Sequence, residues 1–332
     1  MRWKWIITII VILGFGAAAL AYAAYKPLLL SEPVTVTIAH GESTTAIAAQ
    51  LEEHGALRSH RLFIWWARLR GVERHLQPGR YTFSGPTSMD DILDILRQGR
   101  RETVTVTIPE GWTIPRVAER LGAELEFSAE EFVALTEEQE NLDRWGVPNS
   151  HMEGYLLPET YTFFWGAEPE EVLARLADGA EAVFVDSIEA RVEAIGMTRH
   201  EVLTLASMVE AEAGIGDERP VIASVFHNRL RRRMLLQCDP TVIYAMGGLA
   251  PGHQLWSKNL EIDSPYNTYK HPGLPPGPIC NPGEAAIMAA LYADSTNYLY
   301  FVADGTGGHI FSRTLEEHNR ARARVKRSGQ GG

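Results

Sequence analysis

The chain has 332 residues, enough for about two domains of ~150 residues each. Hydrophobic residues make up 45% and charged residues 22%, a balance that supports a packed core and argues against a largely disordered chain. The formal net charge of −11 argues against nucleic acid as a partner, because phosphate binding needs a cationic face. The sequence motifs of zinc proteases, P-loop enzymes, serine hydrolases and dinucleotide-binding folds are missing, so we expect no cofactor and no metal.

The first notable feature in chain order is an uncharged apolar stretch, Trp5–Ala24. As a helix its 20 residues would be ~30 Å long, which matches the hydrocarbon core of a bilayer. Two bases precede it and Lys26 follows, so the positive-inside rule places residues 1–4 in the cytoplasm and the bulk of the chain outside. We therefore predict a single transmembrane helix over residues 5–24. The alternative is a cleaved signal peptide, because Ala21–Ala23 resembles a small-residue cleavage site.

A small α/β module follows a tether over residues 25–33. Its elements are predicted from alternation, helical periodicity and caps. They are a strand over Val34–Ala39, helices over Thr45–His54 and Ser59–Gly71, a strand within Gln77–Phe83, and a helix from Ser88 to Gly99. This β-α-α-β-α order predicts one module over residues 34–100.

The rest of the chain mixes both types of element, so the predicted fold class is α+β. The segments Thr103–Ile108 and Gly154–Phe163 are strand-like, with a helix over Ile114–Leu121, and we expect a β-rich connecting segment over residues 101–165. Helices dominate from Pro169 to about Ala245, and Tyr298–Ala303 with His309–Ser312 form a predicted hairpin. These elements define a mixed α+β domain over residues 166–320, followed by a basic, solvated tail over 321–332.

Two glutamates mark the candidate site. Thr198 and Glu201 fit a capping box that opens a helix, and Glu210 and Glu212 fall on opposite flanks of the apolar face of that helix. Burial against apolar neighbours favours the neutral form of a carboxyl, and a protonated carboxyl near neutral pH is what a general acid needs. Periodicity alone does not choose between the two residues.

Further along, Asp239-Pro240 is expected to be an N-cap followed by proline, which explains Asp239 structurally. A loop rich in proline and glycine then carries Tyr266, Asn267 and Tyr269. Rigid loops often carry function, and aromatic rings beside amides suit a sugar, because the rings cover C–H faces while the amide reads hydroxyl groups.

Several long segments carry a resemblance to a known family. They are Glu153–Phe163 (EGYLLPETYTF), Ala206–Glu212 (ASMVEAE), Asp217–Leu230 (DERPVIASVFHNRL), Leu236–Gly247 (LQCDPTVIYAMG), Ser264–Tyr269 (SPYNTY), Gly273–Gly283 (GLPPGPICNPG) and His309–Asn319 (HIFSRTLEEHN). Together they resemble the endolytic murein transglycosylases of the MltG (YceG-like) family.

The resemblance implies a single inner-membrane anchor with the N-terminus cytoplasmic, a LysM-like module at residues 34–100, and a periplasmic catalytic domain. It implies Glu210 as the catalytic residue. We expect the matching segments to contact substrate through Ser207, Asn228, Gln237, Asp239, Tyr266, Asn267 and Tyr269. The implied partners are peptidoglycan glycan strands and the inner membrane, with peptidoglycan synthases as further candidates and no nucleic acid.

The implied reaction cleaves nascent strands between N-acetylmuramic acid (MurNAc) and N-acetylglucosamine (GlcNAc), leaves 1,6-anhydroMurNAc ends and so terminates strand elongation. In that reaction Glu210 protonates the leaving oxygen and the muramyl 6-hydroxyl attacks C1, so one carboxylate suffices. A hydrolytic muramidase would instead need a second carboxylate, for which Glu212, Glu218 and Asp239 are the nearest candidates. A scaffold that binds peptidoglycan without cleaving it is the other alternative.

The chain has two cysteines, Cys238 and Cys280. Both follow the apolar stretch, in an oxidising compartment, so we predict that they pair in a disulfide. The alternative is that both are simply small buried residues.

Overall fold

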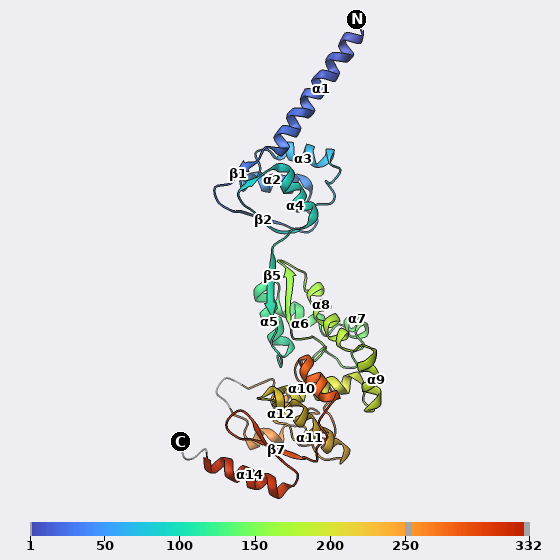
Figure 1. Cartoon of the computed structure of the whole chain (residues 1–332), viewed down its shortest axis with the longest axis vertical. Coiled ribbons are helices and arrows are strands. Elements are labelled where there is room, and N and C mark those ends of the chain that lie inside the picture. The colour runs from blue at the N-terminus through green and yellow to red at the C-terminus, as the bar shows by residue number, and fades with distance from the viewer. Residues whose placement is uncertain (1, 250–253, 329–332) are drawn as a thin grey trace. The chain divides into compact units, whose positions relative to one another are not determined.

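The computed structural model describes residues 2–249 and 254–328, which form two compact units (Figure 1). The first unit holds the described residues up to Thr105 together with Thr162–Ala167. The second unit holds Val106–Tyr161 and the described residues from Glu168 onward. Residues 106–161, which we expected to connect two domains, therefore belong to the second unit.

The first unit begins with helix α1, Arg2–Tyr25. Its stretch Trp5–Tyr25 has 21 residues and a mean hydropathy of 2.4, so it is long and apolar enough to cross a membrane. The predicted apolar helix is confirmed.

The module after α1 follows the predicted order. Its elements are β1 (Leu28–Leu29), β2 (Val34–Ile38), α2 (Thr44–Glu53), α3 (His60–Leu69), β3 (Gly79–Phe83), β4 (Pro86–Thr87) and α4 (Met89–Gln98). Strand β2 pairs antiparallel with β3, with Val36 opposite Tyr81. Ser88 caps α4 in a capping box with Asp91, and Gly99 ends it at a φ of 64°. Local signals therefore predict this module well.

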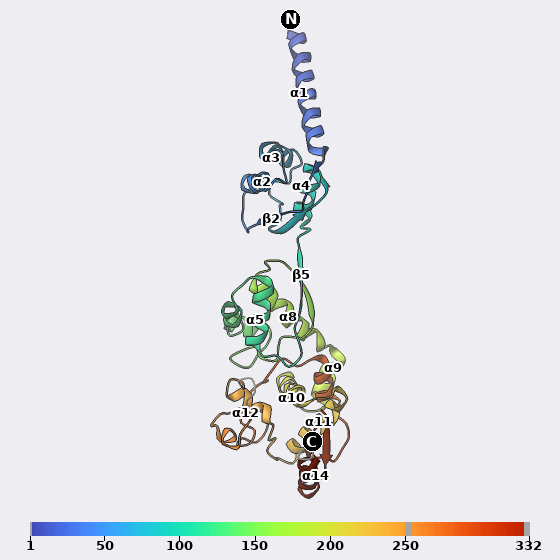
Figure 2. The ribbon, with the colours of Figure 1, turned by 90° about the vertical axis from the view of Figure 1, so that its left-hand side faces the viewer.

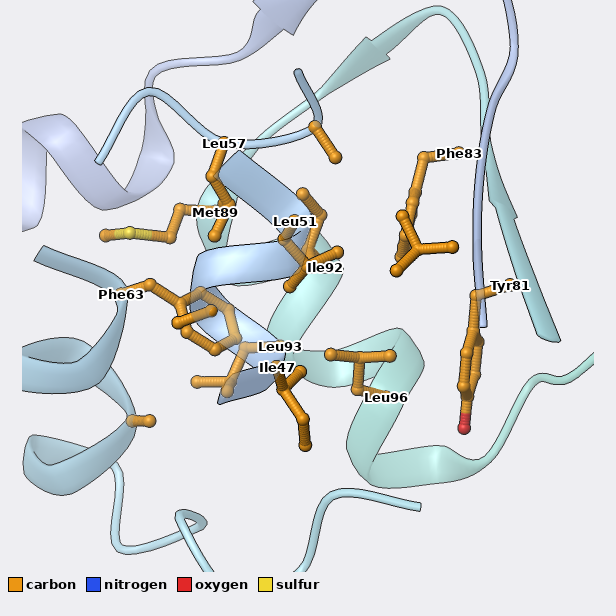
Figure 3. Packing of buried hydrophobic residues seen from close by; sticks show 14 of the residues in the cluster. Ile47, Leu51, Leu57, Phe63, Tyr81, Phe83, Met89, Ile92, Leu93 and Leu96 are labelled. Carbon is orange, nitrogen blue, oxygen red and sulfur yellow. The ribbon is translucent and has the colours of Figure 1, made fainter. Parts of the chain in front are cut away.

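The core of the first unit lies between these helices and strands. Figure 3 shows side chains from α2, α3, β3 and α4 meeting in one cluster. The largest fully buried side chains of this cluster are Ile47, Leu51, Phe63, Tyr81, Phe83, Ile92, Leu93 and Leu96. Burial of this apolar surface is what stabilises the module.

Strands β5 (Thr103–Thr107) and β6 (Thr160–Phe164) pair with each other. Between them lie α5 (Ile114–Leu125), α6 (Ala129–Leu135) and α7 (Gln139–Arg144). The prediction of a β-rich segment over residues 101–165 is therefore wrong, because its three helices contain more residues than its two strands. The strand predicted over Gly154–Phe163 begins only at Thr160. The backbone N–H groups of Gly154 and Leu156 donate to the Asn281 side chain instead of to a strand.

The remaining elements of the second unit are mainly helical. They are α8 (Pro169–Val183), α9 (Asp186–Ala194), α10 (Arg199–Glu212), the 3₁₀ turn η1 (Gly216–Glu218), α11 (Arg219–Arg231), α12 (Asp239–Ala245), η2 (Ser257–Glu261), α13 (Glu284–Leu291), β7 (Tyr300–Ala303), β8 (His309–Ser312) and α14 (Leu315–Ser328). The predicted hairpin is confirmed, with Tyr300 opposite Ser312 in an antiparallel pair.

Helix α10 is the centre of the second unit. It packs against α11, α12 and α13, and both views of the ribbon show α10 and α11 close together (Figures 1 and 2). Residues Val202–Val209 are all buried, so the helix is covered on every side over two turns. The solvated tail predicted over residues 321–332 is helical up to Ser328, where α14 buries Ala321 against the fold; residues 329–332 lie outside the described part.

Candidate active site

The last turn of α10 carries both candidate glutamates. Thr198 begins the helix in the predicted capping box with Glu201, and the helix ends at Glu212. Residues two apart on a helix point about 200° apart, so the two carboxyl groups leave α10 on different sides. Their surroundings therefore decide which of them meets a substrate.

Glu210 is held in a cluster of fixed partners. Its side chain is 6% exposed, and its Oε1 accepts a hydrogen bond from Arg219 Nη2 at 2.8 Å. Its Oε2 accepts from the backbone N–H of Gly283 at 3.2 Å. Arg219 also pairs with Glu110 at 3.0 Å. Glu210 thus joins α10 to α11 and to the loops before α5 and α13.

Glu212 faces a cavity of about 590 Å³. The lining includes Arg229, Gln237, Asp239, Tyr269, His309 and Asn319, and Glu210 is not part of it. Burial raises the pKa of Glu212 to about 7, partly offset by a hydrogen bond from the Cys238 thiol and reinforced by the nearby charge of Asp239. A carboxyl with this pKa is half protonated near neutral pH, as a general acid requires.

Two further pairs shape this cavity. His309 Nδ1 lies 2.7 Å from Glu218 Oε2, and the backbone N–H of His309 donates to Glu218 Oε1 at 3.0 Å. Tyr269 donates its hydroxyl to Asp239. Both pairs tie a loop or strand to a helix and hold a polar group at the cavity wall.

Three of the residues predicted to bind substrate, Gln237, Asp239 and Tyr269, line this cavity. Asp239 is not the N-cap that we expected. It is the first residue of α12, and Cys238 occupies the cap position without a capping side-chain bond. The Asp239 carboxylate is therefore free to bond to Tyr269 and to face the cavity.

The other predicted residues hold the fold together. Ser207 is fully buried and accepts from Ile279 N at 3.0 Å. Asn228 Nδ2 donates to the backbone oxygens of Thr296 and Tyr298. Asn267, also fully buried, donates to the backbone of its own loop.

Tyr266 packs against the ring of Tyr244 and accepts from Asn149 at 3.3 Å. Neither Tyr266 nor Ser207, Asn228 or Asn267 is among the described residues that line the cavity. These four side chains bond to or pack against neighbouring parts of the protein, and their contact with substrate stays a prediction.

The structure also contains a buried polar network that sequence reasoning missed. Asn281 is fully buried; its Oδ1 accepts from the N–H groups of Gly154 and Leu156, and its Nδ2 donates to Trp112 O and Glu153 Oε1. Glu153 accepts from Ile114 N at 3.1 Å and so caps α5. Burial raises the pKa of Glu153 to about 8, although the Ile114 N–H opposes this shift.

The predicted disulfide is absent, because Cys238 and Cys280 are both free and buried. Each thiol bonds to a different part of α10: Cys280 Sγ lies 3.4 Å from Ser207 O, and Cys238 pairs with the Glu212 carboxylate. The alternative interpretation of two small buried residues is the one that the structure favours.

Arg229 and His309 are further residues of this cavity that sequence reasoning did not select. No local pattern could have joined them to Glu212, since they are distant in the sequence. Glu212, a carboxyl with a raised pKa, thus lies among arginine, amide and tyrosine side chains with Asp239 on the same wall, an arrangement that makes the cavity a candidate site for acid catalysis on a polar, hydroxyl-rich substrate.

Comparisons with known proteins identify the family of the chain. The model of the YceG-like family matches residues 36–324, so the chain belongs to this family. It is 34% identical over 304 residues to the endolytic murein transglycosylase of Bacillus subtilis (strain 168), covering 87% of this chain and 84% of the relative.

Two further comparisons extend this result. The endolytic murein transglycosylase of Streptococcus pneumoniae R6 is 30% identical over 320 residues, covering 86% of this chain and 57% of that longer relative. The crystal structure of a yceG-like protein, lmo1499 from Listeria monocytogenes, superposes with a TM-score of 0.61 at 34% identity, covering 87% of this chain and 99% of that one.

Proposed function

We propose that this chain is an endolytic murein transglycosylase. It cleaves nascent peptidoglycan strands between MurNAc and GlcNAc, leaves 1,6-anhydroMurNAc ends and thereby terminates strand elongation. Family membership and the names of the relatives support the substrate and the reaction. The observation that carries the chemistry is Glu212, a carboxyl with a raised pKa on the wall of a polar cavity.

The reaction needs one carboxyl group. Protonated Glu212 donates its proton to the glycosidic oxygen, the bond from that oxygen to C1 of MurNAc breaks, and positive charge develops at C1. The muramyl 6-hydroxyl oxygen attacks C1, and the Glu212 carboxylate takes the proton released from that hydroxyl. The new C1–O6 bond closes the anhydro ring, and the acid is regenerated.

We assign this role to Glu212 in place of Glu210, which the resemblance had implied. Both carboxyl oxygens of Glu210 have fixed partners, since Oε1 accepts from Arg219 at 2.8 Å and Oε2 accepts from the backbone N–H of Gly283. Glu212 accepts from a neutral thiol and faces the cavity, so it can reach a sugar oxygen.

The matched substitutions Glu212→Gln and Glu210→Gln test this assignment. We expect Glu212→Gln to lose cleavage by about 10²–10⁴-fold, because the shape is kept and the titrating proton is lost. Glu210→Gln should retain anhydro products at a temperature where it stays folded. Mass spectrometry of digested glycan strands is the measurement. Retained cleavage in Glu212→Gln together with an inactive, folded Glu210→Gln would return the role to Glu210.

A hydrolytic muramidase is the second candidate. One observation favours it: Asp239 lines the same cavity as Glu212, and a second carboxylate could activate water. The same mass spectra separate the candidates, because hydrolysis leaves reducing ends and transglycosylation leaves anhydro ends. A protein that only binds glycan would leave the strands uncut.

We further propose that α1 anchors the chain in the inner membrane, with residues 1–4 cytoplasmic and both units periplasmic. The order β2-α2-α3-β3, with its antiparallel strand pair, supports a LysM-like, glycan-binding role for the first unit. Peptidoglycan synthases remain proposed partners. N-terminal sequencing of membrane-extracted protein tests the anchor, since a mature chain that starts near Ala24 and is soluble would contradict it.

A further inference from the structure

The end of α1 is built into the first unit, with no spacer between them. Ala24 is fully buried in the core of the unit, and Leu20 packs against that core. Arg58 donates to the backbone oxygens of Lys26 and Pro27 at 3.2 Å and 2.8 Å. These contacts fix the exit of α1 to the unit.

This attachment sets the height of the unit above the bilayer. The hydrocarbon core takes about 20 apolar residues of helix, and the apolar stretch Trp5–Tyr25 provides 21. The membrane surface must therefore lie close to Tyr25, where the unit already packs. The part of the unit that surrounds the end of α1 is placed at the level of the lipid headgroups.

Helix α3 lies in that part of the unit, beside the end of α1 (Figure 1). Its inner face is buried, while Leu62, Trp65 and Leu69 on its outer face are 40%, 64% and 68% exposed. Their spacing of three and four residues places them on one side of the helix. Three large apolar side chains are thus turned away from the core of the unit.

The chemistry beside α3 suits a lipid headgroup. A crevice of about 180 Å³ is lined by Tyr22 in α1, by Lys26 just after that helix, by Arg58 just before α3 and by Leu62 in the first turn of α3. Lys26 and Arg58 are exposed cations that can meet phosphate groups. Tyrosine and tryptophan are the residues that favour the membrane–water boundary.

We propose that α3 is an interfacial helix. Leu62, Trp65 and Leu69 insert at the boundary between headgroups and acyl chains of the bilayer that α1 spans, and Lys26 and Arg58 face lipid phosphates. The proposal rests on the proposed membrane anchor and adds a second attachment to it. The first unit is then held flat against the outer leaflet, because two elements bind the same surface.

Fluorescence quenching by nitroxide lipids tests this proposal on the full chain. The protein is reconstituted in vesicles of phosphatidylethanolamine and phosphatidylglycerol, with an environment-sensitive dye on Leu69→Cys. Cys238 and Cys280 are buried, so the dye reacts with the introduced thiol. We expect a blue-shifted emission that nitroxides near the headgroup quench. The matched control is Thr37→Cys on β2, an exposed position of the same unit that should show neither effect.

Two further variants make the result decisive. Replacing Leu62 and Trp65 by Asp should abolish quenching at position 69, whereas Thr37→Asp should leave it unchanged. Equal quenching of the dye at positions 69 and 37 would overturn the proposal. A blue shift at position 69 without quenching would also overturn it, because it would show that protein, and not lipid, covers α3. A dye on Gly14→Cys that deep nitroxides fail to quench would reject the anchor itself, and the interfacial helix with it.

Discussion

Glu210 and Glu212 lie two residues apart on α10, yet their carboxyl groups have different hydrogen-bond partners. Glu210 bonds to Arg219 and to the backbone of Gly283, while Glu212 bonds to the Cys238 thiol and lines the cavity. One helical turn thus carries a carboxyl group paired with an arginine and a carboxyl group on the wall of the cavity, and we propose the second as the catalytic acid. This difference follows from helix geometry, because two residues that are two positions apart on a helix point to different sides and meet different neighbours.

The ion pair of Glu210 should matter for stability. Arg219 is 17% exposed at its side chain, so its removal leaves the nearly buried Glu210 carboxylate without its charged partner. We expect Arg219→Ala to lower the free energy of unfolding by about 3 kcal/mol, as is typical of a broken buried pair. Urea unfolding at neutral pH measures this. Arg232→Ala, at an exposed position after α11, is the control and should change little.

Cleavage should fall as the pH rises through about 7. Glu212 must carry a proton to act as the acid, and its pKa of about 7 means that the protonated fraction is high below this pH and low above it. The measurement is kcat/KM for strand cleavage across a pH series. A falling limb that keeps its position in Glu210→Gln supports Glu212 as the titrating group.

Substitutions of Cys238 provide a control for this fall of kcat/KM with rising pH. Its thiol donates to Glu212 and lowers the pKa of that carboxyl. Cys238→Ala removes the donor, so the falling limb should move to higher pH. Cys238→Ser keeps a donor and should restore the original limb. If the pH at which kcat/KM falls is the same in both variants as in the unmodified protein, a group other than Glu212 is the one that titrates.

His309 and Glu218 should act as one unit in catalysis. Glu218 accepts from the backbone of His309 and pairs with its ring, so the loss of either residue frees the same wall of the cavity. We expect His309→Ala and Glu218→Gln to lower kcat/KM, with the double variant little worse than either one. The coupling energy from such a cycle should be about 0.5–3 kcal/mol. If the losses of kcat/KM in the two single variants add up fully in the double variant, His309 and Glu218 act independently and the prediction is wrong.

Glu153 should make stability depend on pH. In the folded state its pKa is about 8 against an ordinary value of 4.5, so the fold binds this proton more tightly than the unfolded chain does. Its contribution is therefore present below pH 4.5 and is lost as the pH rises towards about 8. Glu153→Gln should flatten this decline in denaturant midpoints measured across the pH series. Glu212 adds a smaller decline in the same direction, which remains in that variant.

The first unit could be predicted from sequence because its signals are local. Ser88 and Asp91 begin α4 and Gly99 ends it, all within one short segment of sequence, and the alternation over Val34–Ile38 predicts a strand. The segment over residues 101–165 could not be predicted in this way. Its backbone at Gly154 bonds to Asn281, 127 residues further along, so a strand-like composition formed no strand there.

The candidate site could be predicted only in part, because some of its signals are local and others depend on contacts between distant parts of the chain. The capping box and the apolar face place Glu210 and Glu212 on one helix, as the sequence predicted. The choice between them depends on Arg219, Gly283 and the hairpin that carries His309, which reach α10 only in the folded chain. Cys238 and Cys280 are a similar case, because spacing does not show that each thiol has a separate partner on α10.

The first unit is completed by a segment that the ribosome makes late. Thr162–Ala167 returns to it after the chain has built Val106–Tyr161 of the second unit, and the Trp165 N–H then bonds to Glu102 O. Until that return, β5 has no partner along its edge, and an open edge can pair with another chain. Nascent protein is therefore most exposed to aggregation between the synthesis of β5 and that of β6. An expression fragment of the first unit should stop near Gly99, before the unpaired strand begins.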